Sequence, residues 1–526
     1  MQRLARLDHR HVWHPFTQMQ EWLQREPIVL VSGRGATVRD ASGRQYLDAN
    51  SSIWTNLHGH RQPQIDTALR QQLSKIAHTS ALGLANAPAS QFAAALVSAV
   101  NRLPLRASLF HRGRGSQGEP RSACSHLAMG NAGVAELFPP NRDRMEIAPA
   151  PSLNEQRAPL LNKVFFSDNG STAVEVALKL AYEHARRSGR SRAPRFLGLQ
   201  GAYHGDTIGA TSLGHIDLFH ATYRGLLFKS DAVMAPYCYR CPYNRARPET
   251  ADARTYRRCH WECVDRVEAK FAAQKKRASS YVGFIYEPRM QGAAGMIPQP
   301  EGWLSRVAEI ARSHGAMLIA DEVMTGFGRT GIGPAKSARS APLWAGQIEG
   351  VTPDFLCLAK GLTGGYLPMA DTLTTDTVFN SFLGDYGDYK TFFHGHSYTA
   401  NQLGAAAGRA SLSLLQSSKS FVDRKNLERQ LTAELANLWD LPQVGDIRQV
   451  GLVVGIELVR ERSTRLPFAP VERAGFRVCD AMSRRGVLTR AIGDVIVLMP
   501  PYCTQPAQVR RMVRVLHDSI AEVLGE

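Results

Sequence analysis

The sequence has no long uninterrupted run of apolar residues. No stretch reaches the roughly 18 residues that a membrane-spanning helix needs. The first 16 residues, MQRLARLDHRHVWHPF, also lack the apolar segment of a secretory signal. These two absences favour a cytoplasmic protein that has no membrane partner.

Cysteine is scarce for a chain of this size. Eight cysteines among 526 residues are too few for the dense disulfide framework of small secreted proteins. Cys238, Cys241, Cys259 and Cys263 form two close pairs, which is a pattern found in zinc sites. The spacing of the second pair is atypical, and His260 makes the ligand set ambiguous. We therefore expect free thiols and no bound metal, with a zinc site as the alternative.

Acidic residues are fewer than basic ones, 46 against 63, which leaves a net charge of +17. Residues 101–163 hold nine basic and five acidic residues, and residues 238–280 hold eleven and five, so ten of the excess charges lie there. Neither stretch contains a helix-turn-helix, a zinc finger or a basic motif interleaved with aromatics. We expect solvated, arginine-rich insertions and no nucleic-acid partner. A non-enzymatic protein that binds nucleic acid in a salt-sensitive manner is the competing hypothesis.

Strands alternate with helices over much of the chain. Short apolar strands are predicted at residues 163–166, 195–199, 281–286, 316–320 and 355–358, each separated from the next by helix-compatible sequence. This alternation predicts an α/β fold whose mostly parallel sheet is covered on both faces. After the first strand, apolar residues recur at helical spacing from residue 174 to 185. Thr172 and Glu175 have the spacing of a capping box, which predicts that this helix starts at Thr172.

The two ends of the chain differ from the middle. Residues 27–49 read as short strands with turns, residues 444–459 alternate like a hairpin around Gly451 and Gly455, and residues 487–500 add more strand. We predict a large domain at 76–400 and a small α+β domain made from residues 1–75 and 401–526. The large domain is predicted to carry a poorly ordered insertion at 105–160 and a Cys/Arg-rich insertion at 238–280.

Three polar groups follow predicted strands. Asp321 ends an apolar strand, Lys360 comes just after another, and Asn169-Gly170-Ser171 joins a strand to a helix. Ligands of α/β proteins bind outside the carboxyl ends of the strands. A helix N-terminus attracts phosphate, and Gly170 allows a close approach of the backbone. The sequence therefore predicts a ligand site at this edge of the sheet.

The chemistry of these three groups fits pyridoxal phosphate. A carboxylate such as Asp321 can hold a pyridine nitrogen in its protonated form. A lysine whose pKa is lowered can form a Schiff base with an aldehyde. Each feature has a common structural explanation when it stands alone, such as a helix cap or a surface lysine beside a turn. Together they predict a pyridoxal-phosphate enzyme with Lys360 as its nucleophile.

Longer motifs resemble a known class of enzymes. GAYHGDT at 201–207, YEPRMQGAAGM at 286–296, LIADEVMTGFGRTG at 318–331 and LAKGLTGGYLP at 358–368 resemble the class III aminotransferases, which are fold-type I pyridoxal-phosphate enzymes. The resemblance implies a large domain with a seven-stranded sheet, a smaller second domain and a homodimer with shared active sites.

Five further stretches narrow the resemblance to one branch of that class. They are WHPFTQM at 13–19, SSIWTNLHGH at 51–60, DNGSTAVEVALK at 168–179, TFFHGHSYTANQLG at 391–404 and TRAIGDVIVLMPPY at 489–502. They resemble the aminotransferases that act on 8-amino-7-oxononanoate in biotin synthesis. The resemblance implies a small-molecule transamination with ping-pong kinetics. A class III enzyme that acts on another diamine or ω-amino acid is the nearest alternative.

The resemblance also implies roles for single residues. Lys360, Asp321 and Tyr203 would be catalytic, with Tyr203 stacked on the cofactor ring and Asp321 at its nitrogen. Further cofactor-binding residues would be Gly170, Ser171, His396 and Ser397, the last two reaching the cofactor of the neighbouring subunit. The substrate site would include Phe16, Ile53, Tyr203, Lys360, Gly395 and Arg490, with Arg490 binding the substrate carboxylate.

Two positions depart from the pattern of that branch. Many members that use S-adenosylmethionine have tyrosine where this chain has Phe16, and tryptophan where it has Ile53, next to Trp54. The pocket for the amino donor therefore differs. We expect S-adenosyl-L-methionine as the donor, because it is the more common one in the branch, and L-lysine is the alternative.

Overall fold

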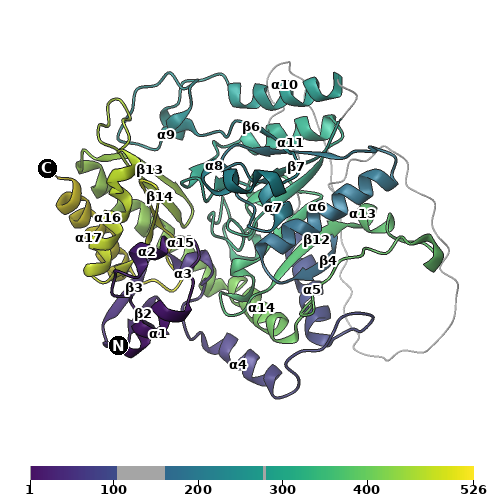
Figure 1. Cartoon of the computed structure of the whole chain (residues 1–526), viewed down its shortest axis with the longest axis horizontal. Coiled ribbons are helices and arrows are strands. Elements are labelled where there is room, and N and C mark those ends of the chain that lie inside the picture. Colours follow the sequence, from purple (N-terminus) through teal and green to yellow (C-terminus); the bar gives the residue numbers. More distant parts are fainter. Residues whose placement is uncertain (1, 103–159, 277–279, 526) are drawn as a thin grey trace, which may run out of the picture. The chain divides into compact units, whose positions relative to one another are not determined.

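The computed structural model describes residues 2–102, 160–276 and 280–525 (Figure 1). The insertion predicted at 105–160 therefore lies outside the described residues, apart from its last position. None of the described helices is both long and apolar enough to cross a membrane.

A seven-stranded sheet forms the centre of the fold. Strand β12 runs antiparallel to both of its neighbours, and the other pairs are parallel. The predicted α/β fold with a mostly parallel sheet is confirmed. In spatial order the strands are β4 (Leu161–Ser167), β12 (Ala370–Thr375), β11 (Phe355–Leu358), β10 (Met317–Asp321), β7 (Tyr281–Tyr286), β5 (Arg195–Leu199) and β6 (Asp231–Val233).

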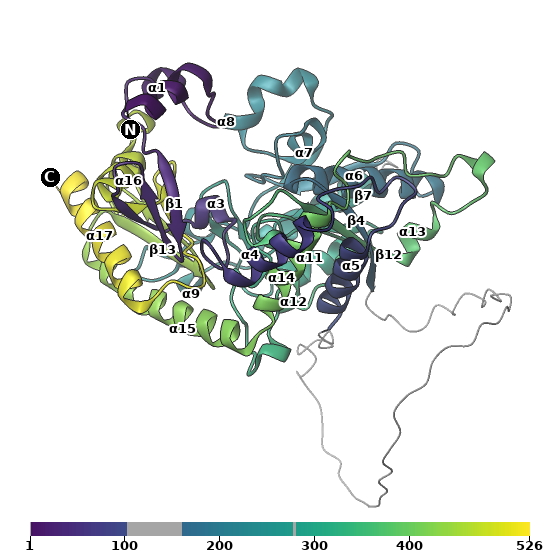
Figure 2. The same cartoon turned by 90° about the horizontal axis from the view of Figure 1, so that it is seen from below.

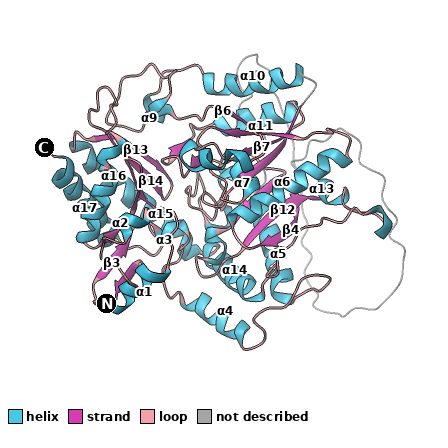
Figure 3. Cartoon of the chain, in the orientation of Figure 1, coloured by secondary structure: helices cyan, strands magenta, loops and turns pink. Residues whose placement is uncertain are grey.

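Helices cover both faces of this sheet (Figure 3). Every residue of β7, β10, β11 and β12 is buried, as expected for strands with helices on either side. One face packs against α6 (Gly170–Arg187) and α7 (Ile208–Leu213) through a cluster that includes Val174 and Ile319. The other face packs against α5 (Ala87–Val100), α10 (Glu262–Lys276), α11 (Trp303–Ser313) and α14 (Gln402–Leu415).

The N-cap of helix α6 lies three residues before the predicted one. It is Asn169, whose side chain accepts a hydrogen bond from the backbone N–H of Thr172 at 3.2 Å. The Thr172 hydroxyl in turn accepts from the backbone N–H of Asn169 at 3.0 Å. The predicted capping box of Thr172 and Glu175 is therefore wrong, because asparagine is as good an N-cap as threonine and stands nearer to the strand. Glu175 is left free to bond elsewhere.

Strands from both ends of the chain form two smaller sheets. Strand β3 pairs with β15 in parallel, so the first and last parts of the sequence share a sheet. This pairing supports a small domain built from both ends, and its boundaries at 75 and 401 stay predictions. The sheets are β1 (Leu30–Arg34), β2 (Thr37–Asp40), β3 (Gln45–Asp48), β15 (Val487–Leu488), and β13 (Val444–Val450), β14 (Val453–Leu458), β17 (Val495–Leu498), β16 (Arg490–Ile492).

The hairpin predicted at residues 444–459 is confirmed, with its turn at Gly451 and with Gly455 inside β14. Helix α17 (Pro506–Leu524) packs beside α16 (Ala474–Arg484) and α15 (Ser418–Leu435) at this end of the molecule (Figure 2). The remaining helices and strands are α1 (Gln2–His11), α2 (Met19–Trp22), α3 (Ser51–Trp54), α4 (Pro63–Leu73), α8 (Asp217–His220), α9 (Ala253–Tyr256), α12 (Ala345–Ile348), α13 (Asp376–Asn380), β8 (Met290–Gln291) and β9 (Ile297–Pro298).

The prediction of a solvated, arginine-rich insertion is wrong for two arginines of the Cys/Arg-rich stretch, which bond to the smaller sheet. Arg240 pairs with Glu457 of β14, with 2.6 Å between Nη2 and Oε1. Arg254 donates to the backbone carbonyl of Gln449 in β13 at 2.7 Å. Both side chains are largely covered, so they attach this stretch to the smaller sheet.

The four cysteines of that stretch are free thiols. Cys238 and Cys263 are buried, and burial raises the pKa of each thiol to about 12. Across residues 2–102, 160–276 and 280–525, no group of three or more His, Cys, Asp or Glu side chains is arranged to hold a metal ion.

Candidate active site

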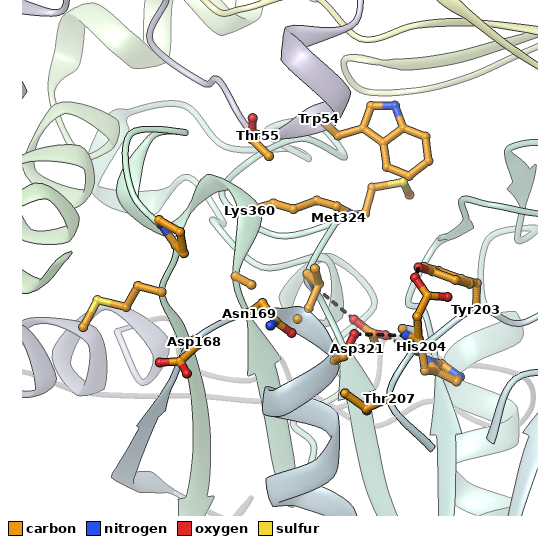
Figure 4. Close-up of a pocket in the computed structure, with 18 of the residues that line it drawn as sticks. Trp54, Thr55, Asp168, Asn169, Tyr203, His204, Thr207, Asp321, Met324 and Lys360 are labelled. Atoms are coloured by element: carbon orange, nitrogen blue, oxygen red, sulfur yellow. Dashed lines mark hydrogen bonds and ion pairs between the residues drawn. The ribbon is translucent and has the colours of Figure 1, made fainter. Parts of the chain in front are cut away.

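The carboxyl ends of β4, β11 and β10 open into one cavity of about 700 Å³ (Figure 4). Asp321 is the last residue of β10, Lys360 follows β11, and Gly170 and Ser171 begin α6 directly after β4. All four line the cavity, together with Tyr203. The fold therefore brings together the three groups that the sequence placed after separate strands.

Lys360 is half-buried in the wall of this cavity. Burial lowers the pKa of its amine, and the nearby carboxylates of Asp321 and Glu287 oppose that shift. Its Nζ lies 4.7 Å from the ring centre of Trp54. The backbone φ of Lys360 is +27°, a value that L-residues rarely adopt and that is held at functional sites by the surrounding structure. A lysine whose pKa is lowered loses its proton more readily than a solvated lysine, and the free amine is the nucleophile.

Asp321 and His204 form a buried pair. The Oδ2 atom of Asp321 lies 2.8 Å from Nδ1 of His204, and Oδ1 accepts from the backbone N–H of Val323 at 3.1 Å (Figure 4). Both side chains are nearly inaccessible to solvent. These bonds fix the orientation of a carboxylate at the cavity wall, where it can hold a protonated ring nitrogen.

The start of α6 is shaped to receive a phosphate. Its first backbone N–H groups have no partner within the helix. A side chain at Gly170 would approach Val323 to 2.8 Å, so glycine keeps this end open. The hydroxyl of Ser171 accepts from the backbone N–H of Asp206 at 3.1 Å. At Gly205, with φ +120°, a Cβ would lie 2.1 Å from the Ser171 hydroxyl, so only glycine fits.

Tyr203 presents an aromatic ring to the same cavity. Its hydroxyl donates to Asp206 at 2.7 Å, and burial raises the pKa of the phenol. Its backbone N–H donates to Oε1 of Glu287 at 3.3 Å, and Gly292 N–H donates to Oε2 at 2.8 Å. Burial raises the pKa of Glu287 to about 7. Sequence reasoning missed Glu287, although a carboxylate directly after β7 is the same signal that identified Asp321.

Trp54 is a second residue that the sequence did not single out. It ends α3, in which Ser51, Ser52, Ile53 and Trp54 all have φ between +47° and +69°. Such left-handed residues are costly, about 1–2 kcal/mol each. Two bonds from Ser52 to Asp48, at 3.0 and 2.9 Å, help to hold the turn. The turn directs Trp54 into the cavity and leaves Ile53 45% exposed and outside the lining.

Phe16 and Arg490 lie outside the cavity lining but are linked to it through Tyr203. The ring of Phe219 packs edge-on against the rings of Phe16 and Tyr203, at centroid distances of 5.3 and 6.1 Å. Arg490 is near enough to Tyr203 to oppose electrostatically the rise in phenol pKa that burial causes. Within the part of the chain that the structure describes, Arg490 has no ion pair of its own, so it is available to bind an anion.

Residues 395–397 are also outside the lining. His396 Nδ1 lies 3.4 Å from Oδ2 of Asp168, which is itself a cavity residue of the same chain. The backbone carbonyl of Ser397 accepts from His78 at 2.8 Å, and Gly395 has open space around its α-carbon. Their predicted contact with a neighbouring subunit stays a prediction.

Comparison with known proteins assigns this arrangement to a family. The family model described as aminotransferase class-III matches residues 19–116 and 142–520. The chain belongs to the class III aminotransferases. Its cofactor is pyridoxal phosphate, which the lysine, the carboxylate, the aromatic ring and the helix N-terminus described above fit.

Relatives cover nearly the whole chain. Adenosylmethionine-8-amino-7-oxononanoate aminotransferase of Nitratidesulfovibrio vulgaris is 41% identical over 99% of this chain and 82% of its own length. The protein of that name from Geobacter sulfurreducens is 40% identical over 100% and 98%. The crystal structure of the Methanocaldococcus jannaschii protein of that name covers 99% of both chains at 32% identity and a TM-score of 0.79. An amine transaminase from an uncultivated Pseudomonas species, solved with its cofactor bound, matches at 27% identity and a TM-score of 0.77.

Proposed function

We propose that this aminotransferase transfers an amino group to 8-amino-7-oxononanoate and so forms 7,8-diaminononanoate, a step of biotin biosynthesis. The observation that carries this proposal is the identity of about 40% to enzymes named for that acceptor, over almost the full length of the chain. Their shared name also contains adenosylmethionine, which supports S-adenosyl-L-methionine as the amino donor.

Bound pyridoxal phosphate would supply an aldehyde that accepts the amino group and a ring that withdraws electrons from the reacting carbon. Gly170 and Ser171 would hold its phosphate, Asp321 would keep its ring nitrogen protonated, and Tyr203 would lie against the ring. Burial lowers the pKa of Lys360, which favours the free amine, so its Nζ could remove the proton from the donor's α-carbon and act as the acid and base of the transfer. The same groups then act in reverse on the acceptor, which predicts ping-pong kinetics.

The acceptor has a long apolar chain that ends in a carboxylate. Arg490, on β16, is the cation proposed to bind that carboxylate through its planar fork. Phe16, Phe219 and Tyr203 form a continuous set of edge-on aromatic contacts between the N-terminal segment and the cavity. This set offers an apolar surface for the methylene chain. Ile53 stays a proposed contact for the amino donor, at the rim of the cavity.

We also propose a homodimer with shared active sites. Residues 386–398 carry several large exposed side chains, among them Tyr386 at 96%, Phe393 at 70% and Tyr398 at 63%. Such side chains favour burial against another protein surface. In the dimer, Gly395, His396 and Ser397 would reach the neighbouring subunit's cofactor and substrate.

A pair of half-reactions tests the proposed activity. Purified protein loaded with pyridoxal phosphate receives either S-adenosyl-L-methionine or L-lysine, and the visible absorbance of the cofactor is followed. We expect S-adenosyl-L-methionine to bleach the band and 8-amino-7-oxononanoate to restore it. A Lys360→Ala variant should show neither change.

The other outcomes identify the alternatives. Bleaching by L-lysine alone, with recovery by the same acceptor, would keep the reaction and change the donor. Failure of 8-amino-7-oxononanoate to restore the band would reassign the enzyme to a different acceptor, such as that of another class III ω-aminotransferase.

A further inference from the structure

Glu175 lies in the second turn of α6, outside the lining of the cavity. Its Oε1 atom accepts three hydrogen bonds from the segment that enters α7. The donors are the Thr207 hydroxyl at 2.6 Å, Gly209 N–H at 2.7 Å and Ala210 N–H at 3.1 Å. A Cβ at Gly209 would lie 2.2 Å from the other carboxylate oxygen, so the approach is close.

The segment held by Glu175 carries much of the cofactor site. Residues 203–207 supply Tyr203, which faces the cavity, and His204, which bonds to Asp321. Asp206 N–H donates to the hydroxyl of Ser171, one turn before Glu175 on the same helix. Two residues of α6 therefore bind this loop, Ser171 at its middle and Glu175 at its end. These attachments tie the loop to α6, beside the bonds of Tyr203 N–H to Glu287 and of His204 to Asp321 that tie it to the sheet side of the cavity.

The negative charge of Glu175 is unfavourable for a phosphate bound at the start of α6, although its oxygen holds the loop beside that site. Four residues of helix separate it from Ser171, which is a rise of about 6 Å. A carboxylate at that separation repels a phosphate bound at the start of the helix. Within the described ranges no cation forms an ion pair with Glu175, and Lys179, one turn later, bonds instead to His394 at 3.1 Å. Three donors converge on one oxygen of Glu175.

We propose that Glu175 is a positioning residue for the cofactor: its acceptor oxygen fixes the loop at residues 203–207 onto the phosphate-binding helix. Affinity for pyridoxal phosphate depends on that oxygen and not on the negative charge. Glu175 touches neither the cofactor nor the substrates, so its effect passes through Tyr203, His204 and Ser171.

Three variants of the full chain distinguish the effect of the acceptor oxygen of Glu175 from the effect of its negative charge. Glu175→Gln keeps an acceptor oxygen and removes the charge, whereas Glu175→Ala removes both. Glu183→Ala is the matched control, because Glu183 lies two turns further along α6 and, among the described residues, its ion-pair partner is Arg187 alone. The readouts are the dissociation constant of pyridoxal phosphate by equilibrium dialysis and the visible absorbance maximum of the bound cofactor.

We expect Glu175→Ala to weaken cofactor binding about tenfold or more, which is the loss of one to two net hydrogen bonds, and to shift the absorbance maximum. Glu175→Gln should bind within about threefold of the parent or more tightly, and Glu183→Ala should match the parent. Equal weakening in Glu175→Gln and Glu175→Ala, or parental affinity in Glu175→Ala, would overturn the proposal.

If circular dichroism shows that Glu175→Ala does not fold, Thr207→Val tests the same bond from the donor side. It removes only the hydroxyl and should weaken the affinity about threefold, and an unchanged affinity would again overturn the proposal. Because these measurements involve no substrate, their outcome does not depend on which acceptor the enzyme uses.

Discussion

Asp371 is a fully buried carboxyl residue outside the lining of the active-site cavity. It lies on β12 between Phe166 of β4 and Leu358 of β11, with no solvent exposure. Neither carboxyl oxygen has a hydrogen-bond partner in the described structure. Burial raises the pKa of this carboxyl well above its usual value. An unpaired buried carboxyl destabilises the protein in which it lies.

Replacing Asp371 with valine should therefore stabilise the protein by about 1–3 kcal/mol. The gain should grow from pH 5 to pH 8. At pH values between the unfolded-state and the raised folded-state pKa, the folded chain holds a proton on Asp371 that the unfolded chain has released, so parental stability falls as pH rises through that range. Thermal unfolding of the cofactor-free protein across this pH range measures both effects.

Thr372→Val is the control for this prediction. Thr372 is the neighbouring buried residue on β12, and its hydroxyl donates to the carbonyl of Ala173 at 2.8 Å. Its replacement should lower stability by about 1 kcal/mol with no dependence on pH. A lower melting temperature for Asp371→Val would show that Asp371 has a partner that offsets its burial.

At the scale of elements, the turn between β13 and β14 packs against the segment that follows β10. Gly451, in the β13–β14 hairpin, has φ +61° and packs directly on the backbone of residues 330–331. A Cβ at this position would lie 2.0 Å from the backbone nitrogen of Gly331. Both the conformation and the contact therefore require glycine.

Gly451→Ala should lower the free energy of unfolding by more than about 2 kcal/mol, because the left-handed conformation is costly for alanine and the added Cβ would overlap the backbone of residues 330–331. Gly493 provides a matched control. It has a similar φ of +57° in the β16–β17 turn, but a Cβ there would meet nothing within 4 Å. Gly493→Ala should cost only about 1 kcal/mol, the conformational penalty alone. Similar losses in the two variants, measured by chemical denaturation, would argue against the close contact at Gly451.

At the scale of the whole molecule, the proposed dimer can be tested by mixing two inactive variants. Lys360→Ala lacks the nucleophile but keeps His396 and Ser397. The double variant His396→Ala, Ser397→Ala keeps the lysine. In a mixed dimer with shared sites, one active site would combine Lys360 of one chain with His396 and Ser397 of the other.

We expect each variant alone to be nearly inactive and the refolded mixture to recover up to about a quarter of parental activity, since half of the dimers are mixed and each has one complete site. A mixture of Lys360→Ala with Asp321→Ala should recover none if both groups act within one chain. Absence of recovery in the first mixture would instead assign His396 to its own subunit, where it already lies 3.4 Å from Asp168.

Much of this protein could be predicted from local sequence. The apolar runs before Asp321 and Lys360 predicted β10 and β11, and the position of each residue at a strand end predicted a shared cavity. Strand ends are visible in sequence because the apolar run stops where the ligand site begins. The N-cap of α6 was misplaced by three residues, since Asn169 and Thr172 are both good N-caps and only the bonds formed decide between them.

By itself, the sequence determined the class of fold and placed Asp321, Lys360 and the Gly170-Ser171 turn at the ends of strands, because each depends on residue type and on its position beside a strand. Only the tertiary structure decided which other groups join them. The left-handed turn at residues 51–54 directs Trp54 inward and Ile53 outward, and Glu175 bonds to a loop more than 30 residues away. Such contacts depend on how distant elements pack, and no local pattern encodes that packing.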